Sequence, residues 1–267
     1  MSVPHVGFSS VLGTEVLKLK RGRVTGITFL VYAFMVIIGA LFMWMMKNPA
    51  AAAHLGLMGQ KAKFAFGGVS TDWPGFLSFL VVMGGFGSLL MSAVIVTFVF
   101  GREYAEATAK NLLALPLPRS WFVMAKVLVS AGWLALLTLW MAAVSLAAGA
   151  LIGLPGLSAG LLVDVSARLL ALAGMSLCCS TLVAWVAVET RGYFGPLGFA
   201  IGTLVLASVF GHTGWASWVP WSIVGLYSGT AGPVTGLGVG NFAVLGVTFV
   251  IGLALTLRHE VLVDNAQ

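Results

Sequence analysis

Six long apolar runs dominate this sequence and restrict it to one broad class of fold. A helix needs about 20 predominantly apolar residues to cross the hydrocarbon core of a bilayer. Apolar residues make up 60% of the 267 residues and charged residues only 8%, whereas a typical soluble domain is about 25% charged, so most of this surface must face lipid. The runs are continuous and do not alternate, which favours helices over the strands of a membrane barrel. They span residues 25–46, 75–100, 127–152, 169–188, 193–210 and 234–257. We therefore expect an all-α, polytopic membrane protein with six transmembrane helices in a single transmembrane domain, residues 1–267.

Lysine and arginine residues are distributed unevenly around these runs. If the N-terminus is cytoplasmic, ten of the 14 basic residues fall on the cytoplasmic side, as the positive-inside rule requires. The ten are Lys18, Lys20, Arg21, Arg23, Arg102, Lys110, Arg119, Lys126, Arg191 and Arg258. We expect a multi-pass protein of the plasma (inner) membrane with both termini in the cytoplasm. The net charge of +6 does not indicate nucleic acid as a partner, because no soluble face is available to bind phosphates.

An amphipathic helix is expected before the first run, at residues 6–23. Its apolar residues recur at helical spacing, and they are Phe8, Leu12, Val16 and Leu19. Such a helix lies flat at the membrane interface, with its basic residues near anionic lipid headgroups. It can serve as an anchor alone, or as an elbow that also contacts a partner, and the sequence leaves both interpretations open.

The segment between the second and third runs, "GREYAEATAKNLLALPLPRSWFVMAK", concentrates polar residues in an otherwise apolar chain. Its pattern predicts a short amphipathic helix over residues 102–116, and Pro116 and Pro118 then stop that helix because proline lacks an N–H group and restricts its predecessor. The apolar stripe of this helix consists of Tyr104, Thr108, Leu112 and Leu115. An ordinary solvated loop is the alternative, but a loop needs neither an apolar stripe nor a rigid stop.

This segment resembles the cytoplasmic loop of the type-2 permeases of ATP-binding-cassette (ABC) transporters. In that family an acidic–Tyr pair is followed by a small residue and Thr, a Leu-rich run, a Pro with a basic residue, and later a Lys that opens the next span. The matching positions are Glu103, Tyr104, Thr108, Lys110, Leu113, Pro116, Arg119 and Lys126. At Ala107 the family commonly has Gly, and because Ala is the better helix former we expect the helix to continue through this position.

The resemblance implies a membrane permease subunit whose coupling helix, residues 102–116, docks into a groove of a separate ABC ATPase subunit. The apolar stripe would contact the groove, while Glu103, Glu106 and Lys110 would orient the helix by charge at the rim. The expected docking residues are Arg102, Glu103, Tyr104, Glu106, Thr108, Lys110, Leu112, Leu115 and Arg119. The sequence contains no G-x-x-x-x-G-K-[ST] phosphate loop, so we expect no enzyme activity, no catalytic or metal residues, and no cofactor in this chain, with ATP and Mg bound by the partner.

Residues 211–233, between the fifth and sixth runs, are too interrupted by Gly and Pro for an ordinary span. The resemblance implies a short re-entrant hairpin on the outer side of the membrane. Tryptophan prefers the headgroup region, so an aromatic belt and an outer gate over the transport pathway are both possible interpretations. The candidate gate residues are Trp215, Trp218, Trp221 and Tyr227. On the same outer side, just before the fourth run, Asp164 and Arg168 are spaced i,i+4. This spacing predicts an interfacial salt bridge, with a substrate contact as the alternative.

The resemblance also implies a second permease chain, identical or different, and outward transport. Because no run carries a charge at its centre, an amphipathic or hydrophobic substrate such as a drug, a peptide antibiotic or a lipid-like molecule suits the pathway. An ion-driven secondary transporter is the first alternative, favoured by the Gly- and Pro-interrupted fifth run. An intramembrane enzyme is the second, although the sequence has no H-E-x-x-H motif and no paired Asp residues.

Overall fold

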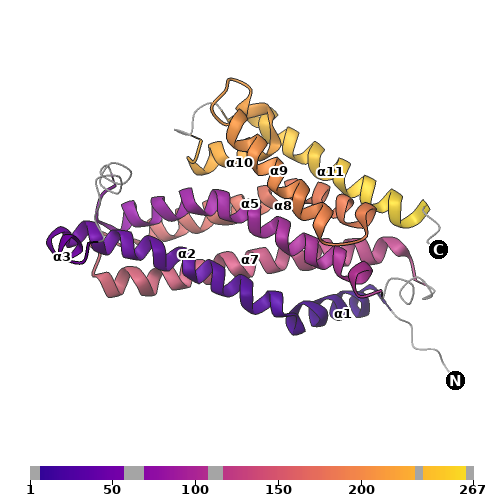
Figure 1. The fold of residues 1–267 in the computed structure, drawn as a ribbon, viewed down its shortest axis with the longest axis horizontal. Helices are drawn as coiled ribbons and strands as arrows, with labels where there is room; N and C mark the ends of the chain where they lie inside the picture. Colours follow the sequence, from indigo (N-terminus) through magenta and orange to yellow (C-terminus); the bar gives the residue numbers. More distant parts are fainter. Residues whose placement is uncertain (1–6, 57–68, 108–116, 232–236, 263–267) are drawn as a thin grey trace.

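The protein is an elongated bundle of helices in which the long apolar segments run side by side (Figure 1). The computed structural model describes residues 7–56, 69–107, 117–231 and 237–262. The first helices are α1 (Phe8–Arg21), α2 (Arg23–Lys47), α3 (Pro49–His54), α5 (Trp73–Ala105) and α7 (Arg119–Ile152). They are followed by α8 (Ala159–Thr190), α9 (Phe194–Phe210), the 3-10 turn η1 (Ala216–Trp218), α10 (Pro220–Ser228) and α11 (Val239–Leu262). Within these residues there is no strand, which confirms the predicted all-α class.

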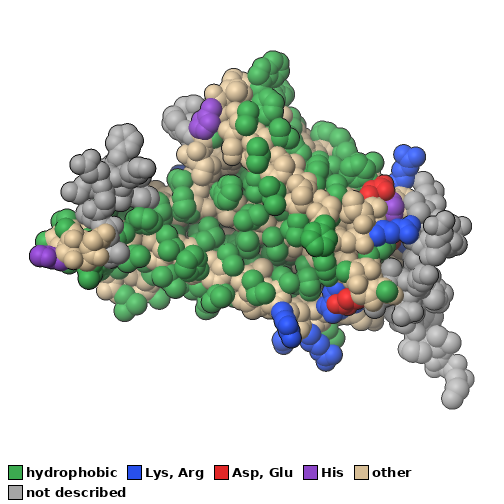
Figure 2. Space-filling view, in the orientation of Figure 1, with side chains coloured by type: hydrophobic (Ala, Val, Ile, Leu, Met, Phe, Trp, Pro, Cys, Tyr) green, Lys and Arg blue, Asp and Glu red, His purple; other side chains and the backbone are tan. Residues whose placement is uncertain are grey.

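Five helices of the described chain are long and apolar enough to cross a membrane, namely α2, α5, α7, α8 and α11. The apolar helix α9 has 17 residues, which is the lower end of the length that spans a bilayer. Apolar side chains cover much of the molecular surface in Figure 2, as expected for a surface that contacts lipid. The chain is therefore a polytopic helical membrane protein, while the assignment of six spans stays a prediction.

Several helices extend beyond the apolar runs that predicted them. Helix α8 begins at Ala159, ten residues before the predicted span, because Ser158 caps it by accepting a hydrogen bond from the Leu161 N–H at 3.2 Å. Helix α7 begins directly after Pro118, and α5 continues to Ala105. Hydropathy marks the part of a helix that suits lipid, whereas backbone hydrogen bonding continues until a cap or a proline ends it.

Helix α5 is the central element of the bundle and packs most extensively against α8. Hydroxyl groups connect these two helices at four-residue intervals, where they share one face of each helix. The Ser88 Oγ lies 2.8 Å from the Ser176 Oγ, and the Ser92 Oγ lies 2.7 Å from the Ser180 Oγ. Helix α5 also contributes fully buried apolar side chains to the core, among them Phe76 and Ile95. Interhelical hydroxyl bonds of this kind hold membrane helices together without introducing charge.

The two ends of the bundle differ in charge. In Figure 2 the Lys, Arg, Asp and Glu side chains gather at the end that carries α1 and the end of α11. At the opposite end, the Lys47 ammonium donates to the carbonyl oxygens of Ile152 and Gly153 at 2.7 and 2.8 Å, so it caps the C-terminus of α7. The predicted salt bridge between Asp164 and Arg168 is confirmed, with a 3.0 Å contact that is exposed to solvent.

Candidate functional site

A buried carboxylate at the end of α5 connects three helices. The Glu103 side chain accepts from the Lys126 ammonium of α7 through Oε2 at 2.5 Å, and from the Lys18 ammonium of α1 through Oε1 at 2.9 Å. Only 9% of Glu103 and 3% of Lys126 is exposed. We call Lys18, Glu103 and Lys126 the ionic junction, because each carboxylate oxygen of the central residue meets a lysine from a different helix.

Further charged groups surround the ionic junction and balance it. The Lys18 ammonium also contacts the buried Glu15 carboxylate at 2.6 Å, so two lysines face two carboxylates. Burial alone would lower the pKa of Lys18, but the Glu103 and Glu15 carboxylates outweigh burial and raise it. The Arg102 guanidinium donates to the Lys18 carbonyl oxygen at 3.1 Å, and the Lys126 ammonium lies 5.3 Å from the centre of the Phe100 ring. The charges of the ionic junction are therefore paired within the chain.

The end of α11 joins the same region through Glu260. The Tyr104 hydroxyl donates to the Glu260 Oε1 at 2.8 Å, and the Arg119 guanidinium donates to the Glu260 carbonyl oxygen at 2.9 Å. Tyr104 is in the last turn of α5 and Arg119 is the first residue of α7. Helices α1, α5, α7 and α11 are thus tied together on both sides of the connection between α5 and α7.

The structure divides the predicted coupling helix into two parts. Residues 102–105 belong to the last turn of α5, which ends at the cap residue Glu106. Ala107 has a φ of 53°, a left-handed conformation that glycine adopts most readily. The expectation that a helix continues through Ala107 is therefore wrong, because α5 ends at Ala105 and the backbone turns at Ala107.

The predicted docking residues follow this division. Glu103 has contacts inside the chain in place of the exposed rim position that the sequence suggested, while Glu106 is exposed and pairs with Arg102 at 2.8 Å. Tyr104 and Arg119 also bond within the chain. The remaining predicted docking residues lie outside the described residues, and they are Thr108, Lys110, Leu112 and Leu115.

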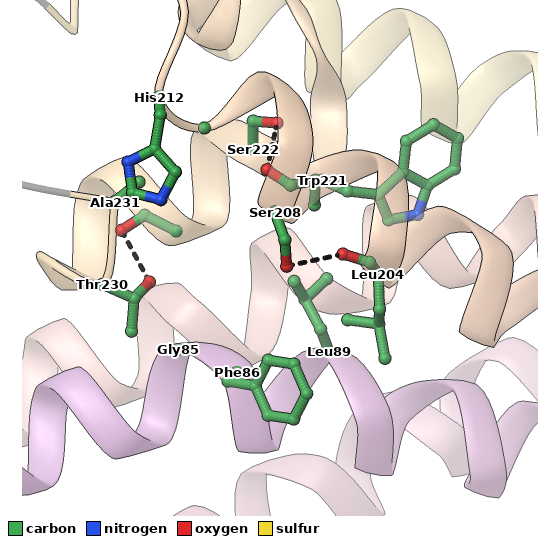
Figure 3. A pocket seen from close by; sticks show the side chains of 13 residues that line it. Gly85, Phe86, Leu89, Leu204, Ser208, His212, Trp221, Ser222, Thr230 and Ala231 are labelled. Carbon is green, nitrogen blue, oxygen red and sulfur yellow. Dashed lines mark hydrogen bonds between the residues drawn. The ribbon is translucent and has the colours of Figure 1, made fainter.

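Toward the opposite end, a cavity of about 130 Å³ opens between α5, α9 and α10 (Figure 3). Apolar and hydroxyl side chains surround it, among them Phe86, Ser208 and Trp221. Trp221 also packs edge-to-face on Phe199, with ring centres 6.2 Å apart. A Cβ atom on Gly85 would lie 2.0 Å from the Ser228 Oγ, so α10 approaches α5 as closely as a glycine permits.

The four predicted gate aromatics differ in how far they are buried. Trp221 lines this cavity and is partly buried, and Tyr227 is partly buried on the same helix. Trp215 and Trp218 are 70% and 59% exposed, as suits side chains at a membrane interface. Of the four, Trp221 is the residue that lines the cavity between α5, α9 and α10.

Sequence reasoning did not find the contacts that organise this site. It used Lys126 as a position of the family pattern and as one of ten basic residues on the cytoplasmic side, and it used Lys18 only in the second of these ways. The available signal was that a carboxylate close to lipid needs a partner, which makes Glu103 a residue whose partners should be sought on neighbouring helices. The serine pairing of α5 and α8 left no signal, because isolated serines in an apolar run are compatible with many packings.

Comparison with known proteins agrees with this architecture. The family model described as "ABC-2 family transporter protein" matches residues 11–210, which include α2 to α9. The bacitracin transport permease protein BCRB of Bacillus licheniformis is 26% identical over 172 residues, covering 64% of this chain and 82% of that protein. The chain therefore belongs to the ABC-2 family of transporter proteins, as a membrane permease subunit.

Proposed function

We propose that this chain exports an amphipathic substrate and is driven by a separate ABC ATPase subunit that docks on residues 106–116. The observation that carries the proposal is the ionic junction, which joins Glu103 before this segment to Lys126 after it in the sequence. A partner that displaces the segment acts on the end of α5 and the start of α7 at once. Through Lys18 and Glu260 the displacement also reaches α1 and α11.

The junction suits force transmission because it is buried. Removing one partner of a buried ion pair costs about 3–5 kcal/mol, so the ends of α1, α5 and α7 that meet at the junction should move together more readily than they separate. Glu103 lies 18 residues from Gly85 along α5, which is about 27 Å at 1.5 Å per residue. A tilt of α5 at the ionic junction would therefore shift the part of α5 around Gly85 that contacts α10. This shift would change the cavity between α5, α9 and α10.

The orientation of the chain follows from charge. The Lys and Arg residues of α1, the end of α5 and the start of α7 lie at one end of the bundle, where Figure 2 shows the charged groups. The positive-inside rule assigns this end to the cytoplasm, where an ATPase subunit has access to ATP and Mg. With α9 as a sixth span, both termini are cytoplasmic and the segment around η1 and α10 is near the outer face.

The substrate class is inferred from the polarity of the helices. No Asp, Glu, Lys or Arg occurs in residues 74–101 or 169–188, and buried ionisable residues usually mark ion pathways. The relative is named for bacitracin transport, which favours a peptide antibiotic. A second permease chain, identical or different, would complete the pathway, and exposed apolar residues of α9 such as Ile201 and Val205 are available for that contact.

ATPase docking is tested by co-purification of the ATPase subunit with variants of this chain. We expect Leu112→Asp to lose the ATPase, because a charge would enter the apolar contact. Glu103→Gln should retain it, since Glu103 is directed into the chain. Retention of the ATPase by Leu112→Asp, with a normal elution volume for both variants, would contradict the assignment of the docking segment.

Export is tested with bacitracin as the probe. Cells that express the chain with its ATPase subunit should accumulate less labelled bacitracin and tolerate more of it than cells with an ATPase that cannot hydrolyse ATP. Equal accumulation in both strains would exclude bacitracin as the substrate, and a broader set of amphipathic peptides would then be compared in the same assay.

A further inference from the structure

An open groove of about 650 Å³ lies between α1, the start of α2 and α7. Its volume falls within the range of about 300–1,000 Å³ that is common for ligand pockets. Helix α1 contributes Leu12 and Val16, α2 contributes Phe29, and α7 contributes Leu128, Trp133 and Leu136. The groove is on the charged half of the bundle, beside the helix that supplies Lys18 to the ionic junction, and it is separate from the cavity under α10.

The wall of this groove offers hydrocarbon and few hydrogen bonds. The Trp133 indole N–H already donates to the Thr28 Oγ1 at 3.2 Å, and the Thr25 hydroxyl donates to the Leu19 carbonyl oxygen. Val16 and Leu128 are 49% and 47% exposed and face the open space. Three residues of the predicted apolar stripe of α1 therefore line the groove, with Leu19 buried at its base and Val16 exposed, and Leu12 is the third. An occupant must therefore be apolar along this length.

The edge of the groove is basic. Lys20 lines it, and Arg21 and Arg23 follow in sequence with exposed side chains. Unlike Lys18, none of these three forms an ion pair with an acidic group in the part of the chain that the structure describes. Figure 2 shows basic side chains projecting from the surface over α1 and the start of α2. Basic groups at a membrane interface attract anionic headgroups.

We propose that the groove binds one acyl chain of an anionic phospholipid, with the lipid phosphate at Lys20. The apolar wall selects the hydrocarbon, and the unpaired cations select the negative headgroup. A bound lipid would fill the space between α1 and α7, the two helices that supply the lysines of the ionic junction. Lipid binding at this site would therefore allow the lipid composition of the membrane to affect α1 and α7, which are joined at the ionic junction.

The chain offers a matched pair of variants for testing this site. A Cβ atom on Gly132, which lines the groove, meets no heavy atom within 4 Å, so the side chain of Gly132→Leu starts in open space and we expect it to extend into the groove. Gly246 of α11 is equally free of neighbours and lies outside the groove, so Gly246→Leu is the control. Lys20→Gln removes the charge at the edge and, as an exposed substitution, leaves the fold intact.

The experiment uses the purified full chain in lipid nanodiscs that contain a photo-crosslinkable phosphatidylglycerol or phosphatidylcholine, with labelled residues mapped by mass spectrometry. We expect phosphatidylglycerol to label residues 12–20 and 128–136 preferentially. Gly132→Leu should abolish this labelling, Lys20→Gln should lower it about fivefold, as expected for one basic group near an anionic surface, and Gly246→Leu should leave it unchanged. Equal labelling by both lipids, labelling that persists in Gly132→Leu, or crosslinks between two copies of the chain at these residues would overturn the proposal.

Discussion

The charged end of this bundle and the opposite end, called the neutral end because the charges of its described residues balance, are held together by different forces. At the charged end, Glu103 joins two lysines from two other helices in a buried ionic junction. At the neutral end, helices meet through small residues and backbone caps: a Cβ atom on Gly149 would lie 2.4 Å from the Trp73 ring, and Lys47 caps the end of α7. Electrostatic attraction between charges acts over several ångströms, whereas van der Waals packing stabilises only atoms that are in contact. We therefore expect the charged end to move as one unit and the neutral end to open and close.

The largest expected effect is at the ionic junction. Lys126→Met leaves the Glu103 carboxylate with fewer cations in a buried position, and the loss of one partner from a buried pair costs about 3–5 kcal/mol. We expect a large decrease in the unfolding temperature in detergent, measured by scanning fluorimetry.

A second variant separates charge from packing. Glu103→Gln/Lys126→Met removes both partners and should recover part of the lost stability, because no unpaired charge is left on this pair. A double variant that is less stable than Lys126→Met by the full cost of a second independent loss would show that the two residues do not act together.

The next effect tests shape at the neutral end. Gly85→Ala places a Cβ atom 2.0 Å from the Ser228 Oγ and 2.3 Å from the Ser228 Cβ, so α10 must move away from α5, at a cost of about 1–3 kcal/mol for overpacking. Unfolding temperature again provides the measurement. Removing the opposing atoms with Gly85→Ala/Ser228→Gly should restore stability, and a double variant no better than Gly85→Ala would refute the close contact. Gly174→Ala on α8 is the control, because its Cβ would meet nothing within 4 Å.

A smaller effect is expected where α5 meets α8 in the middle of the bundle. Ser92 is fully buried and its hydroxyl lies 2.7 Å from the Ser180 Oγ. Hydrogen bonds between membrane helices contribute about 0.6 kcal/mol on average, so Ser92→Ala should lower stability by about that amount. The measured coupling between Ser92→Ala and Ser180→Ala in a double-mutant cycle should be of similar size, and a coupling of zero would exclude a direct bond.

The smallest effect is expected at the exposed ion pair near the neutral end. The Asp164 and Arg168 side chains are 56% and 54% exposed, and exposed pairs contribute about 0–1 kcal/mol. Arg168→Met should therefore leave the unfolding temperature nearly unchanged, in contrast to Lys126→Met at the other end. A loss comparable to that of Lys126→Met would show that burial does not explain the difference between the two ends.

The sequence predicted the fold class and the approximate position of each long helix, because hydropathy alone separates lipid-facing segments from the rest. It placed helix ends less well. Asp164 and Arg168 suggested that the fourth helix began after them, whereas α8 starts at Ala159 and carries both on its exposed first turns. Charged residues end a membrane span without ending the helix.

The candidate site was less predictable than the fold. The pattern around Glu103 pointed to the right segment, but it did not show that Glu103 turns inward, because its partners come from residues 85 positions before it and 23 positions after it. Contacts of this kind depend on how α1, α5 and α7 pack, and a single sequence contains no record of that packing. The turn at Ala107 was missed because helix propensity is a weak preference that tertiary structure overrides.

The central claim is that the ionic junction transmits movement from the ATPase to the helices of this chain. The most direct test reconstitutes the permease with its ATPase subunit in vesicles and measures substrate transported per ATP hydrolysed. For Glu103→Gln/Lys126→Met we expect the ATPase to stay bound and active, while transport per ATP falls by about tenfold, which corresponds to about 1.4 kcal/mol of lost coupling. An unchanged ratio in a folded double variant would contradict the claim.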